Sequence, residues 1–462
     1  MDAAATMSTT VTPAADHSPA LTADGADLLA LVEIALAEAR LLGASQAEAA
    51  ISMDVGLSVS ARLGEVETIE YQRDRGMGVT VYFGTRKGSA STGDLGAAAL
   101  RETVAKACTI AKYTSEDPCA GLPDPEDLAT NVPGLDLSHP WDITPERACE
   151  MAIACEAAAM AVDRQRITNS EGAAVSTHRG VRAYGNSLGF LASYPGTVHS
   201  VSCSVLGTEG EHMERDYWYS TLRDWRDLES PESVGRRAGE RAVRRLGARK
   251  LATMKAPVLF SPDVARGLIG HFVGAIRGGS QYRRASFLLD AAGQQVFPDW
   301  FALSERPHLM KALASAPFDH EGVATRDREL VEGGVLLGYV LSTYSARKLG
   351  LRTTGNAGGT HNLLVHGRGR SFDEMLQLMG RGLYVTELMG QGVNGVTGDY
   401  SRGAAGFWVE DGELQYPVHE VTIAGNLKDI YRKIVDVGSD VDVRGGIRTG
   451  SILIEEMTIA GD

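Results

Sequence analysis

The sequence predicts a multi-domain α+β protein with antiparallel sheets, and three observations support this fold class. At 462 residues the chain is too long for one ordinary hydrophobic core. Its 53 glycines indicate many tight turns of the kind that join antiparallel strands. Helical and strand-like patterns do not alternate regularly, which argues against a doubly wound parallel sheet.

Composition divides the chain into three segments. Residues 1–24 consist largely of Ala, Thr, Ser and Pro and predict a disordered tail. Residues 25–230 predict an N-terminal α+β domain whose two sub-parts are joined by a proline-rich linker at 115–142. Residues 231–462 predict a glycine-rich C-terminal domain dominated by strands.

Hydrophobic periodicity and capping residues predict the individual elements. Thr144, Ser230, Ser261 and Ser371 each stand where a helix N-cap is expected. Asp411-Gly412 lies between two strand-like runs and predicts a hairpin. The other predicted elements are a helix at 28–42, strands at 57–63 and 79–83, a helix from about 94, a strand meander at 167–220 and a buried strand at 258–260.

Charge and cysteine content narrow the class of protein. The formal net charge of −14 argues against general affinity for nucleic acids or anionic membranes. No basic residue precedes Arg40, and no apolar run reaches the roughly 18 residues of a membrane span. The five cysteines show no paired spacing, which is typical of a reduced protein. We therefore expect a cytoplasmic protein without nucleic-acid or membrane partners.

Three short motifs match catalytic or binding patterns but lack the required context. Gly185–Gly189 matches G-x-S-x-G, yet strand continues after Ser187, so an exposed hairpin is expected. Ser345–Lys348 matches S-x-x-K without its companion motifs and predicts a solvated turn or helix end. Gly390–Gly395 matches G-x-G-x-x-G, but no helix follows, so a glycine-rich loop is expected.

Basic and metal-binding patterns are equally indecisive. The arginine-rich segment 236–250 predicts a solvated helix face. His320-Glu321 and His419-Glu420 lack a second histidine four or five residues later, and His361 and His366 have no glutamate between them. Surface or core histidines are the better interpretation. The residue patterns alone thus specify no active site.

Several long blocks carry a resemblance to a known family. They are Tyr71–Val79, Arg283–Leu288, Ser342–Gly350, Gly398–Glu410 and Tyr416–Leu427. In sequence and order these blocks resemble the PmbA/TldD family, and the similarity spans about residue 25 to the C-terminus. The family consists of cytosolic metallopeptidases that degrade unfolded or small peptides and trim peptide leaders. Some members have been described as modulators of DNA gyrase.

The resemblance implies a place in one of two branches. TldD-like chains carry an H-E-x-x-x-H motif on a helix and a late cysteine as zinc ligands, whereas PmbA-like chains lack them and pair with a TldD-like chain. The matching helix here is 262–277, with His271 at the first position but Phe272 and Ile276 at the Glu and second His positions. No cysteine follows Cys203. The resemblance thus implies a PmbA-like chain without catalytic residues or cofactor of its own, with zinc held by the TldD-like partner.

Three hypotheses follow for the function. The first is a non-catalytic subunit of a peptidase heterodimer acting on peptides, with Gly398, Asp399, Tyr400, Ser401 and Arg402 near the peptide passage or the subunit interface. The second is a non-enzymatic peptide-binding or regulatory homodimer. The third is an independent serine hydrolase that uses Ser187.

Overall fold

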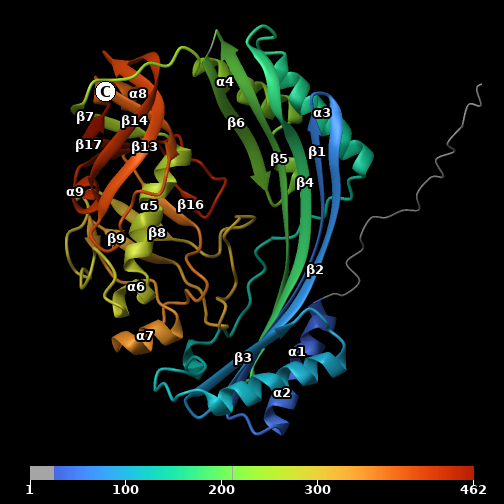
Figure 1. The fold of residues 1–462 in the computed structure, drawn as a ribbon. Coiled ribbons are helices and arrows are strands. Elements are labelled where there is room, and N and C mark those ends of the chain that lie inside the picture. Colours follow the sequence, from blue (N-terminus) through green and yellow to red (C-terminus); the bar gives the residue numbers. More distant parts are fainter. Residues whose placement is uncertain (1–24, 211, 462) are drawn as a thin grey trace, which may run out of the picture.

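The computed structural model describes residues 25–210 and 212–461, so the tail predicted at 1–24 lies outside the described residues. The predicted mixed α+β fold with antiparallel sheets is confirmed. Figure 1 shows a tall curved sheet on one side and a more compact C-terminal body beside it. Among the described residues, no helix is long and apolar enough to cross a membrane.

The tall sheet has six antiparallel strands in the order β3-β2-β1-β4-β5-β6. Four of its strands contain 17 to 20 residues, well beyond the usual five or six. On β1, alternate residues from Ala47 to Ala61 are buried, so one face of the sheet is apolar along its length. The strands are β1 Gln46–Arg62, β2 Glu65–Phe83, β3 Arg86–Thr92, β4 Ile167–Asn186, β5 Leu191–Glu209 and β6 His212–Leu222.

Four helices cover this apolar face in two clusters, one toward each end of the sheet. Helices α1 (Gly25–Leu41) and α2 (Ala97–Tyr113) form one cluster with β1 and β2, and α3 (Pro145–Met160) and α4 (Pro231–Arg244) form another with β4 and β5. Helix α4 packs on α3, β5 and β6, and therefore sits with the N-terminal half beyond the boundary expected near residue 230. Two short 3-10 helices, Pro125–Asp127 and Trp225–Asp227, lie in the connections.

The C-terminal body is built on a sheet that closes on itself. β7 pairs with β12 and β17, and β14 pairs with β13 and β17, so the order β7-β12-β13-β14-β17 returns to its start. Helix α5 (Pro262–Ile276) contributes to the core of this sheet. The strands are β7 Met254–Phe260, β12 Gly382–Met389, β13 Asp399–Glu410, β14 Glu413–Asn426 and β17 Ile452–Ala460, with β15 Ile434–Val437 beside β17.

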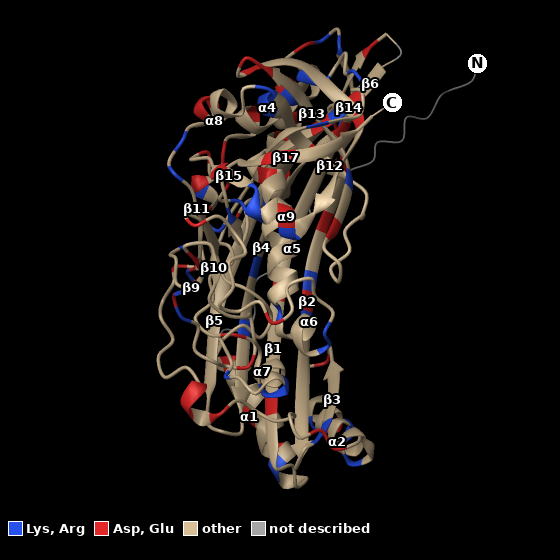
Figure 2. Ribbon diagram, turned by 90° about the vertical axis from the view of Figure 1, so that its left-hand side faces the viewer, with Lys and Arg blue, Asp and Glu red and all other residues tan. Residues whose placement is uncertain are grey.

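A smaller five-stranded sheet completes this body, in the order β10-β9-β8-β11-β16. Its strands are β8 Ala302–Glu305, β9 Arg328–Glu332, β10 Val335–Leu336, β11 Leu363–His366 and β16 Ile447–Arg448. The remaining helices are α6 Gly278–Tyr282, α7 Thr343–Leu349, α8 Phe372–Met379 and α9 Leu427–Arg432. Figure 2 shows charged residues of both signs distributed over the whole molecule.

The helix starts predicted from capping residues are confirmed. The hydroxyls of Thr144 and Ser230 accept hydrogen bonds from backbone N–H groups of their helices, and Ser371 forms a capping box with Glu374. Ser261 also precedes its helix, but its hydroxyl bonds to the Asp263 carboxylate at 2.5 Å instead of capping the backbone. The hairpin at Asp411-Gly412 joins β13 and β14 as expected.

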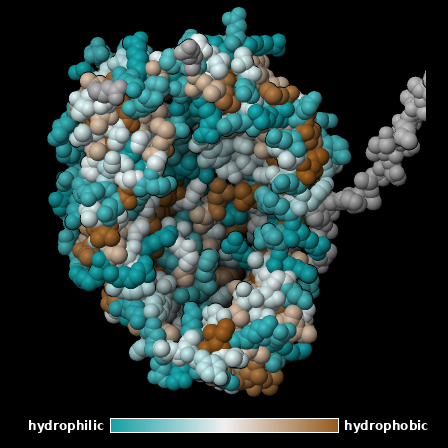
Figure 3. Space-filling view, in the orientation of Figure 1, coloured by the Kyte–Doolittle hydropathy of each residue, from teal (hydrophilic) through white to brown (hydrophobic). Residues whose placement is uncertain are grey.

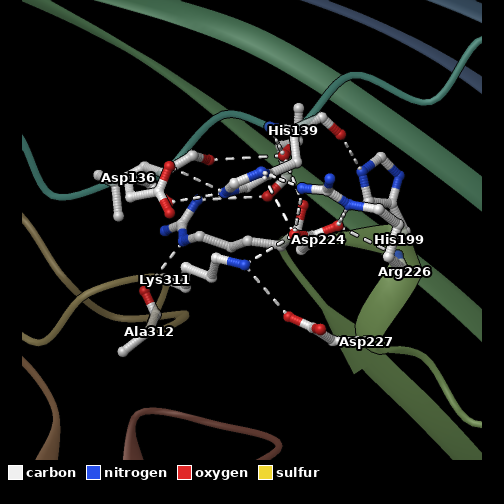
Figure 4. A network of polar contacts seen from close by, with 11 residues as sticks. Asp136, His139, His199, Asp224, Arg226, Asp227, Lys311 and Ala312 are labelled. Carbon is white, nitrogen blue, oxygen red and sulfur yellow. Dashed lines mark hydrogen bonds and ion pairs between the residues drawn. The ribbon is translucent and has the colours of Figure 1, made fainter.

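A polar network joins the two halves at the end of β6 (Figure 4). The Asp224 carboxylate is 2% exposed and accepts hydrogen bonds from the side chains of Arg226 and Lys311, the latter at 2.7 Å. Arg223 donates to the Ala312 carbonyl oxygen at 2.9 Å. The segment at 311–313 of the C-terminal body is thus held against the tall sheet.

Candidate functional site

Helix α5 carries the three residues that the family resemblance aligns with a zinc motif, and they lie in different surroundings. Phe272 and Ile276 are fully buried. The Phe272 ring makes edge contacts with the rings of Phe297 and Tyr431. His271, by contrast, is only half-buried. The His271 imidazole is therefore partly accessible to solvent, whereas the side chains of Phe272 and Ile276 belong to the core.

His271 contacts the second predicted segment, Gly398–Arg402. The His271 and Tyr400 rings meet edge to face, with centroids 6.1 Å apart and planes at 75°. Burial lowers the pKa of His271, and the nearby Arg402 guanidinium lowers it further. The imidazole is therefore neutral at pH 7. The structure brings together two sites that the sequence predicted separately.

The start of β13 is held by the glycine-rich loop at 390–395. The Ser401 N–H donates to the Gly392 carbonyl oxygen at 2.7 Å. A Cβ at Gly392 would lie 2.0 Å from the Ser401 carbonyl oxygen, so only glycine allows this approach. No helix begins after the loop, which confirms the predicted glycine-rich loop in place of a dinucleotide-binding turn.

The side chains of this segment alternate between solvent and core. Asp399 and Ser401 are exposed, and the Asp399 carboxylate accepts a hydrogen bond from Thr397 Oγ1 at 2.6 Å that lowers its pKa. Tyr400 is 2% exposed, and its hydroxyl has no hydrogen-bond partner in the part of the chain that the structure describes. Arg402 Nε donates to the Met389 carbonyl oxygen at 3.1 Å.

The groups around His271 do not fit a zinc ion. Phe272 and Ile276 offer no donor atom, and Arg402 places a positive charge beside the one imidazole. Burial raises the pKa of Tyr400, so its phenol stays protonated. Over residues 25–210 and 212–461, no group of three or more His, Cys, Asp or Glu side chains could hold a metal ion.

A polar cavity of about 340 Å³ lies beside this segment, where α4 and β6 meet α5 and β12. Arg402 and Gly267 form part of its wall. Arg241 pairs with Asp216 at 3.0 Å across the cavity's edge. The prediction of a solvated face for 236–250 is wrong at Arg241 and Arg245, which are largely buried in ion pairs. Their pairs with Asp263 of α5 and Glu387 of β12 join the two halves. Arg245 pairs with Glu214 and with Glu387 of β12.

A larger hollow lies between the tall sheet and the C-terminal body, and Figure 3 shows apolar patches inside it. Two adjoining cavities of about 680 and 360 Å³ share Arg182, Tyr194 and His320 as lining residues. The larger one is bounded by Met77 from β2 and by Phe318 from the C-terminal body. The arrangement can accommodate an extended, partly apolar chain between the two halves.

Two buried carboxyl groups lie at or near this hollow. Asp319, which is 1% exposed, has its pKa raised to about 7 by burial and then by the nearby Glu321 carboxylate. Burial also raises the pKa of Glu48, whose carboxylate accepts hydrogen bonds from the hydroxyls of Tyr184 at 2.8 Å and Tyr82 at 3.2 Å. Near neutral pH a large part of the Asp319 carboxyl population is therefore protonated.

The remaining motifs have structural roles. Ser187 lies in the exposed turn between β4 and β5, as predicted, and its hydroxyl accepts a hydrogen bond from the Ala47 N–H at 3.0 Å. The solvated setting expected for Ser345 is wrong, since it is buried and forms a capping box with Ser342 at the start of α7. Lys348 pairs instead with Asp117 at 3.0 Å.

Two of the histidines weighed as metal ligands have other partners. His366 Nε2 lies 2.7 Å from the Ser304 hydroxyl. His419 Nδ1 lies 3.2 Å from a Glu214 carboxylate oxygen. Both contacts are those of surface or core histidines, as expected.

Comparison with known proteins gives the family. Three family models match in order: PmbA/TldA metallopeptidase domain 1 at residues 47–111, the central domain at 138–246 and the C-terminal domain at 253–461. The metalloprotease PmbA of Escherichia coli O157:H7 is 55% identical over 415 residues, which cover 90% of this chain and 92% of that protein. The chain belongs to the PmbA/TldD metallopeptidase family. A PmbA homologue of Haemophilus influenzae is 49% identical and covers 97% of this chain and its own full length.

Solved structures share this fold. A Bacteroides thetaiotaomicron protein, described with its crystal structure as a candidate modulator of DNA gyrase, superposes with a TM-score of 0.89 at 27% identity and covers 94% of this chain and 98% of its own. TldE from Thermococcus kodakarensis has the same fold, with a TM-score of 0.82 at 21% identity, covering 93% of this chain and all of its own.

Sequence reasoning missed most of the lining of the large hollow in this PmbA-like chain. Arg182 and Tyr194 are cross-strand partners on β4 and β5, but Phe318 comes from a loop far along the chain, and no local spacing links it to them. The one signal was His320-Glu321, which the sequence offered as a failed metal motif and which lies at the hollow.

Proposed function

We propose that this chain is the non-catalytic subunit of a two-chain cytoplasmic peptidase, in which a TldD-like partner holds the zinc and performs the catalysis. The observation that carries the proposal is the surroundings of His271. Its neighbours Phe272 and Ile276 are core residues, and Arg402 opposes a metal cation at the one remaining imidazole. Without a ligand set or a general base, this face has no means to activate water.

Unfolded peptides and peptide leaders are the proposed substrates. The hollow between the tall sheet and the C-terminal body supports this, because its lining combines apolar side chains with several arginines, of which Arg182 lines both cavities. Such a surface suits an extended chain of mixed sequence better than one small ligand. The segment Gly398–Arg402 would then lie on the peptide passage or at the contact with the partner.

The test is to purify the chain alone and together with a TldD-like chain from the same organism. Zinc content and cleavage of an unstructured peptide are measured for each preparation. We expect negligible zinc and no cleavage for the chain alone, and about one zinc per heterodimer with full cleavage for the pair. Stoichiometric zinc and zinc-dependent cleavage by the chain alone would overturn the proposal.

A matched pair of variants tests which of the two chains holds the zinc. His271→Ala in this chain is expected to leave the zinc content and the turnover of the pair unchanged, because this imidazole binds no metal. The control changes the corresponding histidine of the TldD-like partner, which should remove both zinc and cleavage. If no TldD-like chain ever co-purifies although the genome encodes one, the chain acts as a peptide-binding homodimer instead.

A further inference from the structure

The face of the tall sheet that borders the large hollow carries an arginine beside small residues. Residues of a strand alternate between the two faces of a sheet, and Ala183 belongs to the face that α1 and α2 cover. Arg182 therefore projects toward the C-terminal body. Its cross-strand partners are Ser52 on β1 and Tyr194 on β5, and Ser52 in turn lies opposite Gly76 on β2. Because Ser52 and Gly76 are small, the space beside the guanidinium stays open.

The positive charge of Arg182 is not cancelled by a bonded acid. Its guanidinium has no ion-pair or hydrogen-bond partner among residues 25–210 and 212–461, and Asp54 on the same face acts on it only at longer range. The Arg223 guanidinium lies close enough for the two positive charges to repel one another. Arg223 donates to backbone carbonyl oxygens, among them that of Ala312 at 2.9 Å, and these carry no full negative charge. A bound anion would remove this repulsion.

The lining of the hollow is positive as a whole. The residues around the two cavities include four arginines but only two carboxyl groups, those of Asp54 and Asp319. Because burial raises the pKa of Asp319 to about 7, this group carries only part of a negative charge at neutral pH. The cleft therefore concentrates positive potential, although the formal net charge of the chain is −14. This contrast indicates an anionic ligand.

An apolar surface lies next to the arginine. The rings of Tyr194 and Phe318 meet edge to face, with centroids 5.4 Å apart, and both residues line the larger cavity. A lone inorganic anion would leave most of the cavity of about 680 Å³ empty. The hollow therefore suits a larger ligand that combines a negative group with apolar parts.

We propose that Arg182 binds a carboxylate group of the peptide in the hollow, while the rings of Tyr194 and Phe318 contact an apolar side chain beside it. A guanidinium can donate two parallel hydrogen bonds to a carboxylate, which fixes the orientation of the bound chain. The carboxylate belongs to an Asp or Glu side chain or to a free C-terminus, since both present the same two oxygens. The inference rests on the proposed function for the peptide and adds a preference for acidic peptides.

Binding of labelled peptides to the isolated full chain tests the preference. Four peptides with an N-terminal rhodamine share one unstructured sequence that has Glu or Gln at its centre and a free or amidated C-terminus. In fluorescence anisotropy we expect a carboxylate to strengthen binding at least about fivefold over the amidated Gln peptide, and added salt to reduce this difference. Tight binding of the amidated Glu peptide assigns the site to a side chain, and tight binding of the Gln peptide with a free end assigns it to the C-terminus. Equal affinity for all four peptides would overturn the inference.

Substitutions at the arginine and at the nearby acid should act in opposite directions. Arg182→Gln should abolish the preference for a carboxylate, Arg182→Lys should keep part of it, and Asp54→Asn should strengthen it. Arg101→Gln removes the same charge from α2 on the covered side of the sheet and should change nothing. Arg182 is exposed and unpaired among the described residues, so its variants should fold, which circular dichroism checks. A preference that survives in Arg182→Gln would contradict the role of this residue.

The same peptides separate this inference from the proposed function. Cleavage of all four by the zinc-loaded pair at equal kcat/KM, with equal binding to the single chain, would remove the role of Arg182 and leave the two-chain peptidase intact. Zinc-dependent cleavage by the single chain would overturn the proposed function, whatever the charge preference.

Discussion

The Lys311 ammonium group lies 2.7 Å from a carboxylate oxygen of Asp224 and so ties the C-terminal body to the last strand of the tall sheet. Asp224 is the buried member of this contact, whereas Lys311 keeps much of its side chain in solvent. Removal of the buried charge should therefore matter more than removal of the exposed one.

Asp224→Asn is expected to lower the free energy of unfolding by roughly 1–3 kcal/mol at pH 7, since Arg226 and Lys311 lose the negative charge and one of the two oxygens that accept their hydrogen bonds. The pKa of Asp224 lies well below its usual range, first because of the Arg226 hydrogen bond. Its stabilisation is thus present above about pH 4 and is lost as the pH falls. Urea unfolding at pH 7 and pH 3.5 measures both effects. Asp227→Asn, at a more exposed partner of Lys311, should change stability by under about 0.5 kcal/mol.

Asp319→Asn should change the pH dependence of the free energy of unfolding in the sense opposite to that of Asp224→Asn. Because burial raises the pKa of Asp319 to about 7, the folded protein holds a proton there that the unfolded chain releases near pH 4. The wild type therefore loses stability from this group as the pH rises from about 4 to 7, and the variant does not. Chemical unfolding at pH 4.5, 6 and 8 should show the difference, variant minus wild type, increasing with pH. A flat difference over this range would contradict the expected protonation.

Glycines on two helices offer a matched pair for packing. A Cβ at Gly235 of α4 would lie 1.8 Å from the Cys155 carbonyl oxygen of α3, whereas one at Gly270 of α5 meets nothing within 4 Å. Gly235→Ala should therefore push the helices apart and destabilise the fold by about 1–3 kcal/mol. Gly270→Ala should stabilise it by roughly 0.5–1 kcal/mol through helix propensity. Thermal unfolding measures the change in midpoint temperature for each variant. Equal changes would show that α3 and α4 do not pack this closely.

Arg402→Ala tests the proposed peptide passage in the zinc-loaded pair. If the segment Gly398–Arg402 lies along the passage, loss of the guanidinium should raise KM for a peptide about three- to tenfold and leave kcat nearly unchanged. Arg402→Lys keeps the charge and should recover part of the effect. Unchanged KM with a weaker association of the two chains would instead place the segment at the subunit contact.

Local signals predicted the elements well, and distant packing limited the prediction of the site. Caps such as Thr144 and Ser371 act within one turn of helix, so a single sequence reveals them. The burial of Ser345 depends on Gly278, whose Cβ would lie 2.3 Å from the Ser345 hydroxyl, and no local pattern shows that contact. The buried ion pairs of Arg241 and Arg245 likewise depend on acids from β6, α5 and β12.

The same limit applies to the site near α5. The motif positions were found through family resemblance, but the contact between His271 and Tyr400 needed the fold, because β13 must return to the side of α5. The hollow between the halves has no sequence signature at all, since it exists only where the tall sheet faces the loop at 313–320.

The closure of the C-terminal sheet has a consequence for synthesis. β17, at Ile452–Ala460, pairs with both β7 and β14 and follows both of them in the sequence. The ring therefore cannot be completed before β17 has been synthesised, whereas the tall sheet needs nothing beyond α4. A premature stop codon before β17 would leave the facing edges of β7 and β14 open, and the truncated product should be a substrate for cellular proteases.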